Sequence, residues 1–387
     1  MDSENIQKKS HRVVLIASEH TFSQYPVLLR HLLIGLADES VPVALVCPQR
    51  CNVESLSIGA VEIIRHPLLE LPFTSFYNNK LLLEQLMKFK PTVLHCLCES
   101  QALETKFLAW RLNLPYILMV NSFHKHFSML SATGNNLPIS HIHCKKIIAP
   151  TASIVGNFTR TFSHYSDLIQ QVNRGTFTTS KTSCFSRNAN FTTIMMTYPA
   201  HYCERIETIF NSIRHLKING YEFMIFLISN DSMFPKLSFF TKRSVFPSAV
   251  SKTEKQLWKL LNALDLAHLV TIVPPQIPWR QVLESGDIFI DPCPCFVFNS
   301  ILLEAMSVGN AVAAAPGGVD DLIIPEETAI TLESDDEHSI MQTLQRLFDR
   351  PEFARQIARN AQEYVKKNHS VSNMIAQILK IYDEAEI

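Results

Sequence analysis

Residues 286–323 gather the groups that could bind a phosphorylated ligand. Asn299 and Ser300 stand where a helix should begin, and a helix N-terminus offers free N–H groups and a partial positive charge to a phosphate. Glu304 follows about one helical turn later. Glycine is scarce, with only 10 in 387 residues, yet four lie in this stretch: Gly286, Gly309, Gly317 and Gly318. Any glycine-dependent phosphate binding is therefore expected here.

Alternating strands and helices should position these groups. Short β-branched runs alternate with amphipathic stretches of ten or more residues, which is typical of βαβ units and a mostly parallel sheet. Ligands of such sheets bind beyond the carboxyl ends of the strands. The apolar run 287–291 is a predicted strand, so the helix that begins at Asn299 is expected at the ligand-binding edge.

The alternation covers nearly the whole chain. Strands are predicted at 12–17, 42–47, 61–64, 92–95, 115–120, 145–151, 192–197, 222–228, 268–273, 287–291, 311–315 and 329–332. Helices are predicted at 24–38, 80–88, 102–112, 204–216, 254–264, 299–307, 336–348, 351–367 and 371–385, with Thr151 as the N-cap of another.

The length and one polar segment predict two domains. A chain of 387 residues exceeds what one hydrophobic core usually serves. The segment 173–191 is aperiodic and rich in Ser, Thr and Asn, as expected of a linker, and the strand–helix alternation restarts at Thr192. We therefore predict an N-terminal Rossmann-like domain at 1–172, a linker at 173–191, and a second Rossmann-like domain at 192–368.

Composition argues against several classes of function. Lys and Arg number 35 against 36 Asp and Glu, so no global field favours nucleic acid, and nucleic acid is not expected as a partner. The first residues are polar and no apolar run approaches the ~20 residues of a membrane span, which predicts a cytoplasmic protein. The nine cysteines are scattered without CxxC spacing, so reduced thiols are expected and no metal site.

The stretch 287–323 resembles the signature segment of the retaining glycosyltransferases grouped as family 4. The shared features are Asp291-Pro292, a helix that ends Leu303-Glu304-Ala305-Met306, Gly309, a second strand, Gly317-Gly318 and Asp321, in this order. The segment 329–371 resembles the closing helices of the same family, and the remainder of the chain is similar in topology.

This resemblance implies a GT-B fold, with two Rossmann-like domains whose parallel sheets face each other across a cleft. It implies that Glu304 accepts hydrogen bonds from the ribose of a nucleotide sugar, with Asn299, Ser300, Phe296, Gly317, Gly318 and Asp321 around the same ligand. It also implies that the C-terminal helix, 369–387, packs back on the N-terminal domain. The resemblance implies no metal, because GT-B enzymes of this type generally neutralise phosphate with helix ends and side chains. It implies no cofactor, because the nucleotide sugar is itself a substrate. Two alternatives stay open: Glu304 as a surface carboxylate, and Gly317-Gly318 as a tight turn without a ligand.

The sequence departs from the family at charged positions. Phe296 stands where the family has a first glutamate, eight residues before the second. The family's Arg and Lys after the first strand of the second domain are missing, and only Arg205 lies near enough to substitute. Asn121 replaces a histidine of the N-terminal domain, which leaves His124 as a catalytic candidate, although a lone histidine is more often a surface or core residue than a catalyst. Losing one preorganised cation or donor costs a hundredfold or more in rate.

Three hypotheses follow. The first is a retaining glycosyltransferase that moves a sugar from a nucleotide diphosphate donor to a glycan, lipid or protein acceptor, with peripheral membrane contact as a further expectation. The second is a non-catalytic homologue that acts as a binding or regulatory subunit, for instance as the partner of an active glycosyltransferase. The third is another two-domain enzyme, such as an epimerase of nucleotide sugars.

Overall fold

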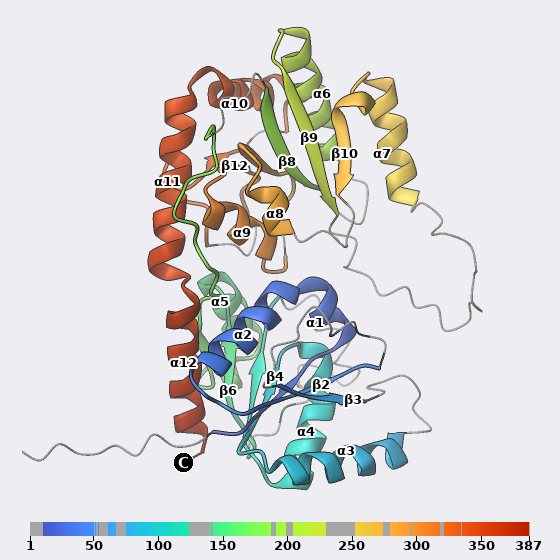
Figure 1. Ribbon diagram of the computed structural model, residues 1–387, viewed down its shortest axis with the longest axis vertical. Helices are drawn as coiled ribbons and strands as arrows, with labels where there is room; N and C mark the ends of the chain where they lie inside the picture. Colours follow the sequence, from blue (N-terminus) through green and yellow to red (C-terminus); the bar gives the residue numbers. More distant parts are fainter. Residues whose placement is uncertain are drawn as a thin grey trace, which may run out of the picture. The chain divides into compact units, whose positions relative to one another are not determined.

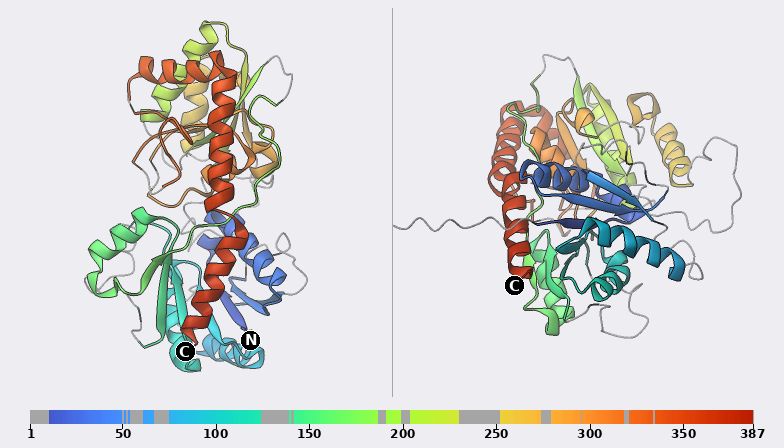
Figure 2. Two further views of the ribbon diagram at one scale, coloured as in Figure 1. Left: turned by 90° about the vertical axis from the view of Figure 1, so that its left-hand side faces the viewer. Right: turned by 60° about the horizontal axis from the view of Figure 1, so that its bottom comes forward.

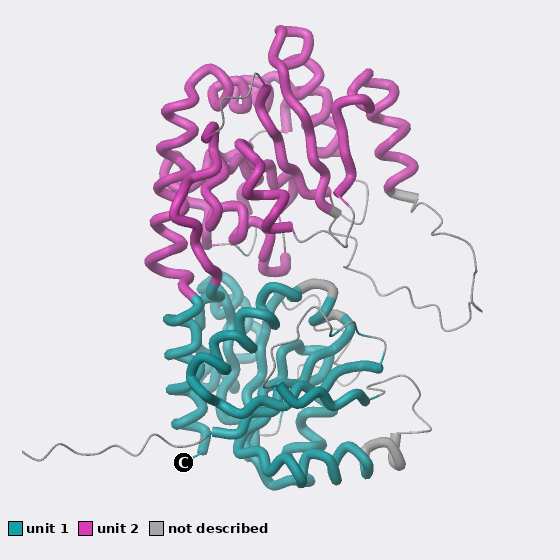
Figure 3. The backbone as a smooth tube through the Cα atoms, viewed as in Figure 1, with its two compact units in different colours: residues 1–175, 371–387 teal, residues 176–370 magenta. Residues whose placement is uncertain are grey.

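A computed structural model describes residues 11–49, 51, 53, 61–66, 75–123, 139, 142–186, 191–198, 204–229, 252–273, 279–294, 296–317, 321–333 and 335–386. The chain divides into two compact units (Figure 3). Unit 1 comprises Met1–Gly175 and Val371–Ile387, and unit 2 comprises Thr176–Ser370. None of the described helices combines the length and the apolar character that crossing a bilayer requires.

Within the described residues, unit 1 contains a seven-stranded parallel sheet with the order β3-β2-β1-β4-β5-β6-β7 (Figure 1). Its strands are β1 (Val13–Ile16), β2 (Val43–Cys47), β3 (Val61–Arg65), β4 (Val93–Cys96), β5 (Tyr116–Met119), β6 (Cys144–Ala149) and β7 (Ile169–Gln171). Every residue of β1, β2, β4 and β5 is buried, as expected of strands that are covered on both faces.

The helices of unit 1 are α1 (Glu19–Gln24), α2 (Pro26–Asp38), α3 (Ser75–Phe89), α4 (Ala102–Leu112), α5 (Ala152–Thr161) and α12 (Val371–Ala385). Helices α3 and α4 pack side by side on one face of the sheet, and α2 and α12 pack together on the other (Figure 2). The Thr151 hydroxyl accepts the Ile154 N–H at 3.2 Å, which confirms Thr151 as the N-cap of α5.

Unit 2 contains a six-stranded parallel sheet among its described residues, with the order β10-β9-β8-β11-β12-β13. The strands are β8 (Thr192–Tyr198), β9 (Phe223–Ser229), β10 (Val270–Val273), β11 (Ile288–Asp291), β12 (Ala311–Ala314) and β13 (Ile330–Thr331). The helices are α6 (Glu204–Ile218), α7 (Lys252–Ala263), α8 (Trp279–Leu283), α9 (Ser300–Val308), α10 (Glu337–Asp349) and α11 (Pro351–Asn368).

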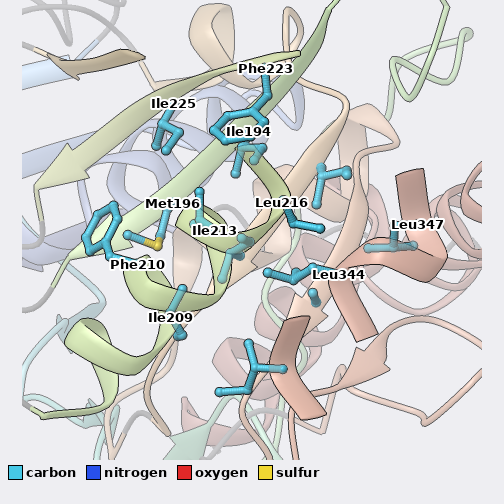
Figure 4. Packing of buried hydrophobic residues seen from close by; sticks show 14 of the residues in the cluster. Ile194, Met196, Ile209, Phe210, Ile213, Leu216, Phe223, Ile225, Leu344 and Leu347 are labelled. Carbon is cyan, nitrogen blue, oxygen red and sulfur yellow. The ribbon is translucent and has the colours of Figure 1, made fainter. Parts of the chain in front are cut away.

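The core of unit 2 lies between its sheet and helices α6 and α10 (Figure 4). Alternate residues of β8, Ile194 and Met196, point to the same face of the sheet, as the two-residue period of a strand requires. Phe210 on α6 and Leu344 on α10 belong to the same buried cluster. This packing fixes β8, and with it the neighbouring β11 that leads to α9.

The segment 173–191, predicted as a linker, is divided between the units. Unit 2 already begins at Thr176, and the Thr179 and Ser183 backbone N–H groups donate to carbonyl oxygens at the end of α9. These backbone hydrogen bonds attach the described second part of the predicted linker to unit 2. The C-terminal helix begins at Val371 and packs within unit 1 against α2 and β6.

Candidate functional site

The candidate site of unit 2 begins at the switch point of its sheet. From β8 the strand order runs outward through β9 and β10 on one side and through β11, β12 and β13 on the other. Ligands of open parallel sheets bind where the order reverses, beyond the carboxyl ends of the two central strands. Thr197 near the end of β8 and Asp291 at the end of β11 meet there, and the Thr197 hydroxyl donates to Asp291 Oδ1 at 3.1 Å.

Asp291 is a buried carboxyl group that connects β11 to the start of α9. Its Oδ2 accepts a hydrogen bond from Asn299 Nδ2 at 2.9 Å. Burial raises the pKa of Asp291 to about 6, and the hydrogen bonds from Asn299 and Thr197 oppose this shift. Through this hydrogen bond to Asn299, the aspartate positions the N-terminus of α9 at the end of β11.

Asn299 caps α9 with its own side chain. Its Oδ1 accepts the backbone N–H groups of Ile301 and Leu302, both at 3.1 Å. These are two of the N–H groups that a phosphate would use at a helix N-terminus. Asn299 and Ser300, predicted to bind the nucleotide, are only 6% and 8% exposed, and Asn299 competes with an anion for this end of the helix.

Glu304 lies inside unit 2, with an exposure of 2%. Arg280 Nη1 on α8 donates to Glu304 Oε2 at 2.7 Å, and the Thr176 hydroxyl donates to Oε1. Arg280 also donates to the Phe177 carbonyl at 2.7 Å. The alternative of a surface carboxylate is therefore wrong. In this structure Glu304 joins α8, α9 and the first residues of unit 2, so ribose binding, which stays a prediction, has to compete with these contacts.

The remaining residues of the resemblance occupy loops beyond β11 and β12. Phe296 is 55% exposed. Gly317 has a φ of +94° and open space where a Cβ would stand, so the chain turns there in a conformation that favours glycine. Asp321 is half-buried, and Gly318 lies outside the described residues. Phe296 thus offers an exposed apolar ring in the place of the family's first glutamate.

Arg205, the candidate substitute for the missing cations, already has partners within unit 2. Arg205 on α6 pairs with Asp335 and donates to the Leu332 carbonyl, so its charge is already balanced. His124 lies outside the described residues.

A second buried polar cluster lies at the switch point of unit 1, between β1 and β4. Arg174, only 2% exposed, donates to Asn121 Oδ1 and stands over the Tyr25 ring at 4.3 Å. Glu99 lies three residues after the end of β4, and its carboxylate accepts a hydrogen bond from the Asn121 backbone N–H. Burial raises the pKa of Glu99, and the nearby Arg174 lowers it. This cluster joins the ends of β4 and β5 to the chain just before unit 2.

The comparisons with known proteins agree with this geometry. Residues 295–380 match the model of a family described as glycosyl transferase-like. A glycosyltransferase structure from Rickettsia africae has 16% identity and a TM-score of 0.73, and covers 97% of this chain and 99% of that one. The Anabaena protein Alr3699/HepE in complex with UDP-glucose has 12% identity and a TM-score of 0.73, over 96% of this chain and 99% of that one. The chain has the GT-B fold.

The same fold also occurs in an enzyme of another class. The UDP-GlcNAc 2-epimerase of Neisseria meningitidis, bound to UDP-GlcNAc, has 13% identity and a TM-score of 0.63, over 96% of this chain and 99% of that one. No curated protein matches the sequence. The resemblance of the signature segment to glycosyltransferases is thus confirmed by the family match and by the GT-B fold, whereas activity has to be argued from the site.

Reasoning from the sequence missed the residues that hold this site together. Arg280 was not singled out, although it is the cation beside Glu304. Glu99 and Arg174 were also missed, and one signal was available for Glu99, because it follows a predicted strand at the ligand-binding edge. Lys145 and Lys146 lie near the amino end of β6, so they stand at the edge of the sheet opposite to the one that binds ligands and do not supply a substitute cation there.

Proposed function

We propose that this protein is a glycosyltransferase that takes a sugar from a nucleotide diphosphate donor and transfers it with retention of configuration. One observation carries the proposal: the segment that matches the glycosyl transferase-like family contains α9, and α9 begins at the switch point of unit 2. Uridine is the proposed nucleoside of the donor, because the structural neighbour Alr3699/HepE has been crystallised in complex with UDP-glucose. The proposed acceptor is a glycan, lipid or protein hydroxyl.

In the proposed reaction the bond between the anomeric carbon and the diphosphate oxygen breaks, and the acceptor oxygen bonds to that carbon. The acceptor proton leaves with the nucleoside diphosphate, so the charges balance. Negative charge grows on the leaving diphosphate, and electrostatic stabilisation of that charge is the largest contribution expected of the protein. The partial positive charge at the N-terminus of α9 is the proposed source within the described residues, together with the turn at Gly317.

Ligand binding is the first test. A ligand that binds only the folded state adds about 2.7 kcal/mol of stability at a hundredfold excess over its Kd. We expect UDP and UDP-glucose to raise the melting temperature, and UDP release to follow when an acceptor is supplied. Glu304→Gln should reduce this shift by weakening ribose binding. Glu284→Gln is the matched control, because Glu284 pairs with the same Arg280 at 3.3 Å but is not a proposed ligand residue.

Failure of UDP, UDP-glucose and other common nucleotide sugars to shift the melting temperature would refute the assignment. An equal shift in Glu304→Gln would refute the ribose contact while leaving the nucleotide site intact. Conversion of the donor to an isomeric nucleotide sugar without an acceptor would identify an epimerase instead.

A non-catalytic binding subunit is the second candidate, and a specific observation favours it. Phe296 cannot accept hydrogen bonds from sugar hydroxyls, and Arg205 and Glu304 are both paired within unit 2. Binding of a nucleotide sugar without any release of UDP would support this candidate. Phe296→Glu should then raise donor turnover if the missing carboxylate is what limits the reaction.

A further inference from the structure

Helix α4 of unit 1 has two apolar faces. One face packs on the sheet through Ala102, Leu108 and Ala109, which are at most 2% exposed. On the outer side Leu103 and Trp110 are 51% and 61% exposed. A helix that covers a sheet needs only the first of these faces.

The outer apolar residues form one stripe. Leu103, Phe107 and Trp110 follow the spacing i, i+4 and i+7, which places them along a single line on the helix surface. Phe107 is half-buried, and its ring centroid lies 6.4 Å from that of Trp110. The stripe thus presents two aromatic rings and a leucine side chain to the exterior of unit 1.

Cations flank this stripe on both sides. At 100° per residue, Lys106 and Arg111 fall to either side of the line through Leu103 and Trp110. The Arg111 guanidinium lies 5.6 Å from the centre of the Trp110 ring. The acidic residue of the helix, Glu104, has a buried Oε2, and burial raises its pKa, so this carboxyl group turns away from solvent.

The adjacent helix also exposes both apolar and cationic side chains. Helix α3 packs beside α4 (Figure 1) and exposes the apolar side chains of Leu81 and Met87. The described second half of α3 also exposes two cationic side chains, Lys80 and Lys88, and contains one acidic residue, Glu84. The two helices therefore combine exposed apolar side chains with an excess of positive charge, although the whole chain carries a net charge of −1.

We propose that the outer stripe of α4, Leu103, Phe107 and Trp110 with Lys106 and Arg111, docks unit 1 on an anionic lipid surface. Leucine and aromatic side chains enter the headgroup boundary, and flanking Lys and Arg pair with anionic lipids while their alkyl stems cover apolar surface. A protein partner fits less well, because protein interfaces are depleted in lysine and span about 20 residues a side. The proposal is independent of which nucleotide the protein binds.

Co-sedimentation of the intact protein with vesicles tests this surface. We expect binding to phosphatidylcholine vesicles that contain phosphatidylglycerol, little binding to phosphatidylcholine alone, and weakening by salt. Leu103→Ser with Trp110→Ser should reduce binding at least tenfold, and Lys106→Gln with Arg111→Gln about fivefold per charge. Ile218→Ser on α6 is the matched control, because Ile218 is 64% exposed and lies in unit 2, and it should leave binding unchanged.

Separate measurements test whether the variants fold and whether the stripe binds something other than lipid. All substituted side chains lie on the outer side of α4, so circular dichroism and melting curves should match the unmodified protein. If the serine pair unfolds nevertheless, the glutamine pair alone decides between the outcomes. Equal binding of the variants and the unmodified protein, or equal binding to both vesicle types, would overturn the proposal. A lipid-free dimer that the serine pair dissociates would assign the stripe to a second copy of the chain instead.

Discussion

Replacing Asp291 by asparagine should change how the stability of unit 2 depends on pH. The pKa of this buried carboxyl group is raised from 3.8 to about 6, so its proton is held more tightly in the folded state than in the unfolded one. A folded pKa above the unfolded value means that the contribution is fully present below about pH 4 and is lost as the pH rises through about 6. The shift of about 2 units corresponds to roughly 3 kcal/mol at 1.36 kcal/mol per unit.

The variant lacks this titration but loses a hydrogen bond. The oxygen of the new amide could still accept from Thr197, whereas its nitrogen would face the Asn299 nitrogen, so one acceptor is lost at a cost of about 1 kcal/mol. Asp291→Asn should therefore be less stable than the unmodified protein near pH 4 and more stable near pH 7. The difference between the two unfolding free energies should change by roughly 2.4 kcal/mol between pH 4 and pH 7, because the unfolded carboxyl group is already partly ionised at pH 4.

Urea unfolding followed by tryptophan fluorescence measures this difference. A Trp110→Phe background removes the tryptophan of unit 1, so Trp258 on α7 and Trp279 on α8 report on unit 2. Measuring both proteins at each pH cancels the titration of all other groups. The slope of the difference against pH then isolates Asp291.

Asp265→Asn is the matched control with the opposite sign. Lys217 lowers the pKa of the exposed Asp265, so that carboxylate contributes stability at neutral pH that is lost on acidification. Its removal should make the variant relatively less stable as the pH rises. A free-energy difference for Asp291→Asn that stays flat between about pH 4 and 7 would show that burial does not raise this pKa.

Three further substitutions test the packing within the two units. Arg280→Ala should destabilise unit 2 by about 3 kcal/mol in urea unfolding, because it removes the arginine that pairs with the buried Glu304 carboxylate. A double-mutant cycle with Glu304→Gln should show strong coupling between the two residues. Arg174→Met should destabilise unit 1 by about 3–5 kcal/mol, as measured by hydrogen exchange, and an unchanged protection of β4 and β5 would contradict this. Gly309→Ala should lower the melting temperature, because Gly309 has a φ of +81° and an added Cβ would stand 2.8 Å from Thr182 Cα. A decrease in the free energy of unfolding below about 1 kcal/mol would show that the backbone adjusts at this position.

The sequence predicted most of the fold because local pattern and tertiary structure agree in this chain. Helix α4 was predicted with its observed bounds, and the central strands were found because parallel strands covered on both faces are continuous apolar runs. The missed elements lack such a signal. Strand β7 is the three-residue stretch Ile-Gln-Gln at the sheet edge, and α8 has only five residues. Both depend on neighbours that are distant in the sequence.

The candidate site was less predictable, since its contacts join distant parts of the chain. Motif spacing located Glu304 on the helix that follows β11, but its partner Thr176 lies 128 residues away. The partner Arg280 lies on a helix too short to show a period. No pattern in one sequence indicates that these side chains meet, so the carboxylate was predicted as a ligand group without its structural partners.

The pairing of Glu304 restricts how this site can work. Glu304 is 2% exposed, and its carboxylate already accepts hydrogen bonds from Arg280 and from the Thr176 hydroxyl. The hydrogen bonds of a bound ribose would therefore add to the binding free energy only by as much as they exceed the hydrogen bonds that they replace. A nucleotide that bound there would also free Arg280 from Glu304, and a freed guanidinium next to the ligand would supply a cation that the sequence lacks after β8. In that case Arg280→Gln should weaken binding of UDP more than binding of uridine, because the lost charge acts on phosphate. If both ligands weaken equally, Arg280 acts only by holding α8 against α9.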